Sequence, residues 1–581
     1  MLMIVTSSIT ALPLLAANTA PVDNAQFEAI YQAEWAWRKK QFADDEDSNN
    51  DAISATLPNV SKAAQDERLH FWKNILARLS KVDTATLSEQ RQVDFTVYQN
   101  QIEALVSEQE FKLYEKPLSG DTSFWGNLAG TARRSFRTEA DYRNYLAQLR
   151  AIPLYFQQNT DNMRAGMKRG FTPPRITLQG RDASAASVAE SKNIVDNIYY
   201  TPFKNMPSGI PAGTQVELKK LAVETIRDHV IPAHKKLLKF LRDDYMPRTQ
   251  TSTAAYDLPD GKAFYQAQIK VYTTLDLPPE EIHQIGLAEV AKIKAEMHDI
   301  MKEVKFQGDL PAFLHFLRTD PQFYVTTPQA LLERAAWICK LFDGKAKDYF
   351  GRLPRARFAI VPAPDDIAPF YTAGRGGPGE YTLNTYNLPS RPLYSLPALT
   401  LHESAPGHAF QMPLAAENKD LPEFRQQSYI SAYGEGWALY SERLGVEMGI
   451  YQTPYERFGM LSYQMWRAAR LVVDTGVHAK RWTREQAQQF LLDNTALSSH
   501  EITTEVDRYI SWPGQALSYY LGQMAIWKVR AKAEAALGSK FDIRAFHDAV
   551  LGLGSVPLPV LEARIDRFIA EGGQMNENAT R

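Results

Sequence analysis

The sequence predicts a mostly α-helical fold with one small β-sheet inserted before a helical C-terminal part. Between residues 25 and 350, apolar residues recur at intervals of three and four, which is the period of an amphipathic helix. Near residue 355 this pattern gives way to short β-rich segments separated by Gly and Pro. After Leu396 the helical period returns. These changes predict two regions, 21–350 and 351–581, behind a distinct segment over residues 1–20.

The first segment, MLMIVTSSITALPLLAANTA, is apolar and carries no charged side chain. With the small residues Ala16, Ala17 and Ala20 near its end, it is typical of a secretory signal peptide. No other stretch is apolar enough to span a membrane. We therefore expect a periplasmic or secreted protein without stable membrane insertion after removal of the signal. A cytoplasmic protein is the alternative, because no basic residue precedes the apolar run.

The region 21–350 contains several long helical patterns. One of them, over residues 277–304, begins with two prolines and two glutamates, which is a signal for a helix N-terminus. Cys339 lies in a later helical pattern, RAAWICKLF, and we expect it to be a buried structural thiol rather than a nucleophile. Because it is the only cysteine, an intrachain disulfide and a thiolate zinc finger are both excluded.

The charge balance argues against nucleic-acid binding. The 581 residues include 65 basic and 67 acidic side chains, which give a formal net charge of -2. A nucleic-acid-binding protein would show a basic footprint instead. Hydrophobic residues make up 44% and charged residues 23%, as in an ordinary soluble globular protein.

The β-rich segments RARFAIVPAP, APFYTAGR and GEYTLNTYN lie between residues 355 and 387. The glycine-rich run GRGGPG among them lacks the strand-to-helix context and the Gly-Lys-Ser/Thr ending of a phosphate-binding loop. We interpret it as a flexible turn or lid. GEYTLNTYN, which contains Tyr381, is a candidate edge strand to which an extended peptide substrate could pair.

Two histidines with an unusual spacing follow the sheet, in LHESAPGHAFQ. Zinc-protease helices carry H-E-x-x-H, with the histidines four residues apart on one helix face. His402 and His408 are six apart, and a step of six turns the side chain by about 240° on an α-helix. They can share a metal ion only if two residues bulge out of the winding. Pro406 conflicts with a carbonyl one turn back and Gly407 is conformationally permissive, so the bulge is expected there.

A third ligand is predicted in the helical segment SAYGEGWALYSERLGVEMG. Glu435 lies there between Gly434 and Gly436, which would let another backbone or an ion approach the carboxylate. Glu442, seven residues later, falls on the same helix face and could orient a histidine ligand from a second layer.

Together, His402, His408 and Glu435 make up the donor set of a zinc site that keeps one coordination position open, as a catalytic zinc ion requires. Glu403, beside the first ligand, would be the general base that takes a proton from the attacking water. The alternative interpretation is a buried structural histidine pair with a capping glutamate.

These motifs resemble those of the bacterial family catalogued as domain of unknown function 885, which has zincin-like helical members. The resemblance rests on LHESAPGH, YGEGWALYSERL, RLVVDTGVHAKRWTREQA and EVDRYISWPGQALSYYLGQ, and it extends upstream to cover about residues 25 to 575. The arrangement is also similar to helical gluzincin metallopeptidases, which lack the two-residue insertion. The resemblance implies a two-lobed fold, a catalytic C-terminal region, a zinc cofactor and peptidase activity.

An oxyanion formed during hydrolysis needs a hydrogen-bond donor opposite the metal. PGQALSYY offers Tyr519 and Tyr520, and the family-like position favours Tyr519. His478, in DTGVHAKRW, is either a rival donor, a second-layer residue or a satisfied core histidine.

Arg508 and Tyr509, in EVDRYI, are candidates for binding a substrate carboxylate. The alternative for Arg508 is a structural ion pair with Glu505 or Asp507.

We therefore expect a zinc-dependent hydrolase whose substrates are short peptides bound in a deep cleft between helical lobes. Two alternatives remain open: a zinc amidohydrolase acting on a non-peptide amide, and a binding protein with a vestigial site. The presence of Glu403 argues against the binding protein, because binding alone has no use for a general base.

Overall fold

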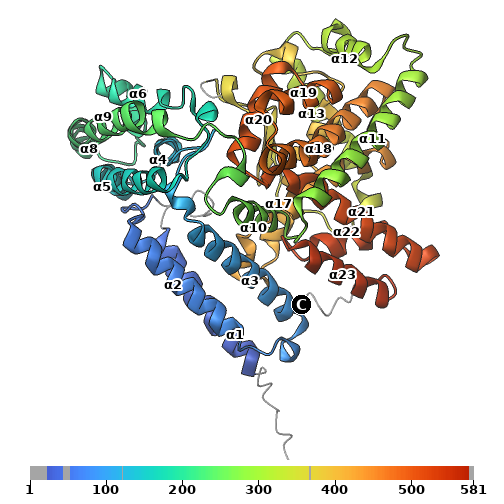
Figure 1. Cartoon of the computed structure of the whole chain (residues 1–581), viewed down its shortest axis with the longest axis horizontal. Helices are drawn as coiled ribbons and strands as arrows, with labels where there is room; N and C mark the ends of the chain where they lie inside the picture. The colour runs from blue at the N-terminus through green and yellow to red at the C-terminus, as the bar shows by residue number, and fades with distance from the viewer. Residues whose placement is uncertain (1–21, 43–52, 121, 366–367, 575–581) are drawn as a thin grey trace, which may run out of the picture.

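The computed structural model describes residues 22–42, 53–120, 122–365 and 368–574, and it confirms a mostly α-helical fold with one small sheet (Figure 1). The predicted signal peptide, residues 1–20, lies outside the described residues. Among the helices in the described part of the chain, none has the length and apolar composition needed to cross a membrane.

One lobe has a hydrophobic core of its own, built almost entirely from residues 118–245. Its longest helix, α5, buries Tyr145 and Leu149 completely. A capping box starts this helix, because the side chains of Thr138 and Asp141 each accept a hydrogen bond from the other residue's backbone N–H. The helices of this lobe, at the upper left of Figure 1, are α4 (Phe124–Gly130), α5 (Glu139–Arg169), α6 (Ala183–Ala189), α7 (Thr201–Lys204), α8 (Ala212–Thr225) and α9 (Ile231–Lys239).

The larger core extends from Phe27 to Phe568 and therefore draws on both regions that the sequence predicts. Its central element is α18 (Pro454–Lys480), in which every residue from Phe458 to His478 is buried. Helix α11 (Pro279–Glu303) packs along α18, and His283 of α11 lies within 2.8 Å of the Thr475 hydroxyl of α18. The predicted boundary at residue 350 does not coincide with a boundary in packing, because helices before it share a core with helices after it.

The remaining helices of the larger body fall into three groups along the chain. The first three lie side by side at the lower left of Figure 1: α1 (Val22–Gln41), α2 (Lys62–Leu79) and α3 (Glu89–Glu110). Three more precede the sheet: α10 (Gly261–Thr273), α12 (Leu310–Thr319) and α13 (Pro328–Tyr349). Those after it are α14 (Leu396–Glu403), α15 (His408–Glu417), α16 (Glu423–Gln426), α17 (Ser431–Glu447), α19 (Arg484–Asn494), α20 (Ser499–Ser511), α21 (Ser518–Leu537), α22 (Ile543–Leu551) and α23 (Leu558–Ala570).

The sheet has three short strands in the order β1–β3–β2, namely β1 (Ala359–Pro362), β2 (Gly374–Gly377) and β3 (Glu380–Leu383). Strand β3 pairs in parallel with β1 and antiparallel with β2. The prediction of an edge strand at Tyr381 is therefore wrong, because β3 is the central strand and Tyr381 is completely buried. The glycine-rich run that we interpreted as a turn or lid supplies the edge strand β2 and the turn after it.

A buried ion pair joins α3 to α16, and it leads to a prediction for the stability of the protein. Arg425 donates to Asp94 at 2.7 Å, and both side chains are almost completely buried. Arg425→Met should lower the free energy of unfolding by about 3–5 kcal/mol, because it leaves the Asp94 carboxylate buried without this partner. In denaturant unfolding, the double variant Asp94→Leu/Arg425→Met should recover most of the loss. An equal loss in both variants would contradict this account.

Candidate metal centre

The two motif histidines lie on separate short helices, on either side of a break in the backbone. Helix α14 ends at Glu403 and α15 begins at His408. Across the break, the N–H of Gly407 donates to the carbonyl oxygen of Leu401, six residues earlier, at 3.0 Å. An α-helix makes this bond to the residue four earlier, so two residues are looped out of the winding. A Cβ atom at Gly407 would lie 1.9 Å from the carbonyl oxygen of His402, so only glycine fits.

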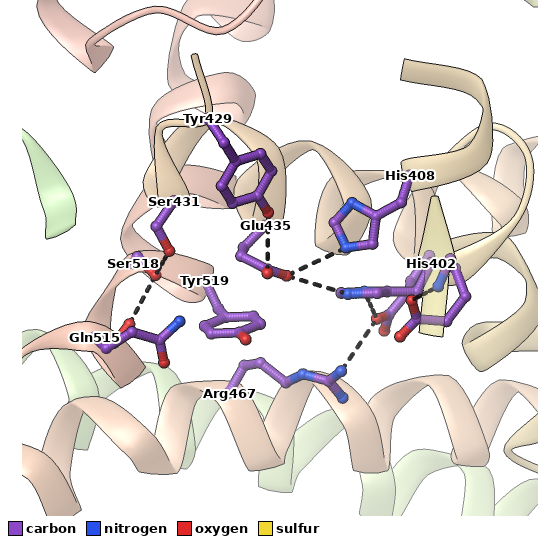
Figure 2. A network of polar contacts seen from close by, with 12 residues as sticks. His402, His408, Tyr429, Ser431, Glu435, Arg467, Gln515, Ser518 and Tyr519 are labelled. Carbon is purple, nitrogen blue, oxygen red and sulfur yellow. Dashed lines mark hydrogen bonds and ion pairs between the residues drawn. The ribbon is translucent and has the colours of Figure 1, made fainter. Parts of the chain in front are cut away.

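The break brings His402 and His408 together, with ring centroids 5.0 Å apart and ring planes at 88°. Glu435 of α17 faces both rings, and its Oε2 lies 3.4 Å from the Nε2 of each histidine (Figure 2). One candidate ligand atom from each of the three residues lies within 4.8 Å of the others. Both histidines are buried, whereas Glu435 keeps 14% of its side-chain surface exposed. These three residues, the donor group, could hold a metal ion that solvent reaches.

Two close contacts fix the position of α17, one to this break and one to helix α21. The indole N–H of Trp437 donates to the carbonyl oxygen of Pro406 at 2.7 Å, which ties α17 to the looped-out residues. On the other side, a Cβ atom at Gly436 would lie 2.5 Å from the backbone of Gly522 in α21. The two helices therefore touch backbone to backbone, and this contact fixes the position of Glu435 relative to the histidines.

Glu442 supports the first histidine from behind. Its Oε1 lies 2.7 Å from Nδ1 of His402. Because a carboxylate only accepts hydrogen bonds, Nδ1 carries a proton, and in the neutral ring Nε2 is left free to act as a ligand. Arg467 of α18 lies 3.9 Å from the same carboxylate and stacks on Trp466, 4.2 Å from the ring centroid.

The electrostatics of the donor group suit a bound cation. Burial by itself lowers the pKa of His402, but the carboxylates of Glu435 and Glu442 outweigh burial and raise it to about 10. Burial raises the pKa of Glu435, but the two histidines outweigh it and hold this pKa well below its usual range. Positive charge is therefore favoured between the rings and the carboxylate. A metal ion would compete with protons for this place, and two imidazoles with one carboxylate are a donor set that fits zinc.

Glu403, the last residue of α14, lies beside the donor group without being part of it. Its Oε2 accepts a hydrogen bond from the backbone N–H of Gly376 at 2.7 Å. Gly376 belongs to β2, which is the edge strand of the sheet. The sheet edge thus holds the carboxylate that the sequence predicts to be a general base.

Tyr519 and Tyr520 of α21 point to different partners. The Tyr520 hydroxyl donates to Glu289 of α11 at 2.7 Å. The Tyr519 hydroxyl accepts from Arg508 at 3.1 Å, and its side chain points toward the donor group in Figure 2. The guanidinium of Arg470 lies over the Tyr519 ring, 4.4 Å from its centroid. Of the two tyrosines, only Tyr519 therefore presents its hydroxyl on the side of the donor group.

Arg508 and Tyr509 have partners inside the protein. Arg508 forms an ion pair with Glu505 at 3.3 Å, which is the structural alternative left open by the sequence. Tyr509 is 1% exposed, and its hydroxyl accepts hydrogen bonds from Trp466 and Arg470. The predicted role of Tyr509 in binding a substrate carboxylate is contradicted by this burial.

Two further residues singled out in the sequence, His478 and Tyr381, lie in the protein interior. His478 bonds only to backbone groups, those of Tyr509 and Ala255, and burial lowers its pKa to about 4. It is a neutral core histidine and not a second-layer residue. Tyr381 lies 3.4 Å from the Thr400 hydroxyl and is shielded from any substrate. Cys339 is half-buried rather than buried as expected, and burial raises its pKa to about 11, so it stays a thiol.

Tyr429 is a residue of the site that sequence reasoning missed. It precedes α17, and its hydroxyl donates to Oε1 of Glu435 at 3.0 Å (Figure 2). Its ring packs on the backbone at Gly434, where a Cβ atom would lie 2.5 Å from the ring. In the sequence, Gly434 indicated that another group comes close to the helix. Nothing indicated that this group is Tyr429, because the tyrosine lies outside any periodic pattern.

A family model described as "Bacterial protein of unknown function (DUF885)" matches residues 45–565. A crystal structure from Colwellia psychrerythraea, described as that of a lipoprotein candidate, has a TM-score of 0.86 and 25% sequence identity, and the match covers 94% of this chain and 100% of that chain. A structure from Shewanella oneidensis, described as a lipoprotein candidate of unknown function, has a TM-score of 0.68 and 18% identity over 94% and 99% of the two chains. No curated protein matches the sequence. The fold is therefore shared with these bacterial proteins.

The donor group predicts how metal content depends on its two histidines. The purified protein should carry about one zinc ion per chain, and His402→Ala and His408→Ala should each lose it, because two remaining donors hold zinc weakly. His478→Gln is a matched control, since it changes a buried histidine outside the donor group. Elemental analysis after dialysis measures the outcome. Full zinc retention in both alanine variants would remove the metal site as described.

Proposed function

The chain belongs to this bacterial family of unknown function, and we propose that the protein is a zinc-dependent peptidase that cleaves short peptides. The observation that carries the proposal is the donor group of His402, His408 and Glu435, with Glu403 beside it but outside it. Three protein donors leave a tetrahedral zinc ion one open position, as in catalytic rather than structural sites. Zinc held there would supply Lewis acidity, which polarises a substrate carbonyl and activates water.

Glu403 is the proposed general base. The backbone N–H of Gly376 holds its Oε2, which leaves Oε1 to accept a proton from the attacking water. The same carboxyl group can then return the proton to the leaving amine. The charge of the Glu403 carboxylate contributes to the raised pKa of His402, so a substrate carbonyl polarised at the donor group would lie near this carboxylate.

Tyr519 is the proposed donor to the oxyanion. Its hydroxyl oxygen accepts a hydrogen bond from Arg508, so its own proton remains available for donation to the substrate. Arg508 and the stacked Arg470 place two positive charges next to the phenol, which strengthens it as a donor. Arg508 is therefore a positioning residue in this proposal, in place of the carboxylate-binding role expected from the sequence.

The edge strand β2 favours an extended peptide as the substrate. A peptide that adds to a sheet edge gains main-chain hydrogen bonds, and β2 is an edge strand of the sheet that contacts Glu403 through Gly376. The strand consists of glycine at three of its four positions, and at Gly376 the backbone of Glu403 lies where a Cβ atom would be. Folded proteins present few such extended segments, which favours short peptides.

We place the protein outside the cytoplasm in this proposal. The similar structures from Colwellia and Shewanella are described as lipoprotein candidates, and lipoproteins of bacteria are exported. A peptidase there would act on peptides of the cell envelope or of the surroundings.

Glu403→Gln tests the proposed chemistry apart from binding. The amide keeps the size of the side chain but cannot take up a proton, so peptide hydrolysis should fall by roughly 10²–10⁴-fold. Zinc content and melting temperature should stay at the wild-type values, because Glu403 is not in the donor group. Turnover on the best substrate from a peptide library measures the effect. Loss of zinc would make Glu403 a ligand, and full turnover would place the base elsewhere.

Tyr519→Phe should lower kcat by roughly 10²-fold or more with little change in KM, which is the scale of losing one oxyanion donor. Tyr520→Phe is the matched control on the adjacent position, since its hydroxyl is bonded to Glu289. Arg508→Met should lower kcat in the wild-type background and add little to Tyr519→Phe, because Arg508 acts through that hydroxyl. Additive losses, or an effect from Tyr520→Phe alone, would contradict the assignment.

A further inference from the structure

The three donors of the metal site differ in what holds them from behind. His402 has the hydrogen bond from its Nδ1 to Glu442. His408 has a buried Nδ1 that makes no hydrogen bond to any of the described residues. Glu435 carries a flexible carboxylate, and the plane of this group must be oriented so that one oxygen faces both imidazoles. Since the histidine pair is supported on one side only, the site needs a contact that selects this orientation.

Tyr429 makes that contact. Its hydroxyl donates to Oε1 of Glu435 at 3.0 Å, while Oε2 of the same carboxylate lies 3.4 Å from Nε2 of both histidines. In Figure 2 the tyrosine lies above the carboxylate and the two histidines lie to its right. The hydrogen bond thus occupies one oxygen and leaves the other, in a fixed direction, for a metal ion.

Gly434 makes the contact possible. Tyr429 lies outside α17, and its ring lies against the first turn of the helix. A Cβ atom at Gly434 would come within 2.5 Å of the ring and within 2.7 Å of the hydroxyl oxygen. An alanine there would push the ring away and break the hydrogen bond to Glu435.

We infer that Tyr429, seated on Gly434, is a positioning residue that fixes the Glu435 carboxylate as a metal ligand. The inference rests on the proposed zinc site and adds a residue to it. A hydrogen bond from outside a metal centre raises affinity by preorganising the ligand, and losing it typically costs 10–100-fold in metal affinity. Tyr429 is 46% exposed, so the residue as a whole contributes little to the packing of the core. Its effect should therefore appear in metal binding and not in stability.

The test measures zinc affinity directly, by competition with a chromophoric chelator on the full chain. Tyr429→Phe should raise the Kd for zinc by roughly 10–100-fold, while the melting temperature of the metal-free protein stays unchanged. Tyr386→Phe is the matched control, because Tyr386 is similarly exposed at 52% and lies outside the donor group. With Co²⁺ in place of zinc, the visible absorption spectrum should also change in Tyr429→Phe and not in the control.

Gly434→Ala distinguishes the effect of the contact between Tyr429 and Glu435 from a general effect on helix α17. In the wild-type background it should weaken zinc binding about as much as Tyr429→Phe. In a Tyr429→Ala background, where the ring is absent, it should add almost nothing, because its effect acts through the ring. Equal zinc affinity in Tyr429→Phe and wild type, or additive losses in the double variant, would overturn the inference while leaving the metal site intact. Absence of zinc binding in the wild type would overturn the metal site and the inference together.

Discussion

The hydrogen bond from Gly407 to Leu401 is the constraint on which the metal centre depends. It closes the backbone over two looped-out residues, so that histidines six apart in sequence meet as if they were four apart. The loop also holds a neighbouring helix, because its Pro406 carbonyl oxygen accepts a hydrogen bond from the indole N–H of Trp437. The break that pairs the histidines therefore also anchors α17, the helix that carries the third donor. The spacing of two ligands and the placement of the third have one physical cause.

Helix α18 supplies the charges behind this centre. Arg467 and Arg470 are three residues apart and share one face of the buried part of this helix. One lies near Glu442 behind His402, and the other lies over Tyr519. Burying two guanidinium groups is costly, and stacking on Trp466 together with the carboxylates of Glu442 and Glu505 offsets that cost. Such an arrangement is hard to explain by packing alone. It fits a site in which the ligand His402 and the proposed oxyanion donor Tyr519 must be held at fixed positions relative to each other.

The sequence revealed the parts of the site that follow from local rules. The donor residues have the right chemistry, Pro406 and Gly407 mark the bulge, and the helical period puts Glu435 and Glu442 on one face. What it missed depends on contacts between distant segments. The sequence of three short strands does not show which of them is central. The sequence therefore predicts an edge position for Tyr381, whereas β2 lies at that edge and Tyr381 is in the central strand. Likewise, nothing local to residue 350 shows that α11 packs along α18 and removes the domain boundary expected there.

The same limit explains why the polar residues around the centre were assigned least well. Tyr509 and His478 look like functional side chains in a motif, but each satisfies hydrogen bonds inside the core. Tyr429 looks like an ordinary loop residue, yet it contacts a candidate ligand. A short motif fixes which residues are near in sequence, whereas burial and the direction of a side chain are set by elements that pack from elsewhere. At this centre the sheet edge, α17, α18 and α21 all contribute contacts, so the role of a polar residue follows from which of these elements it meets.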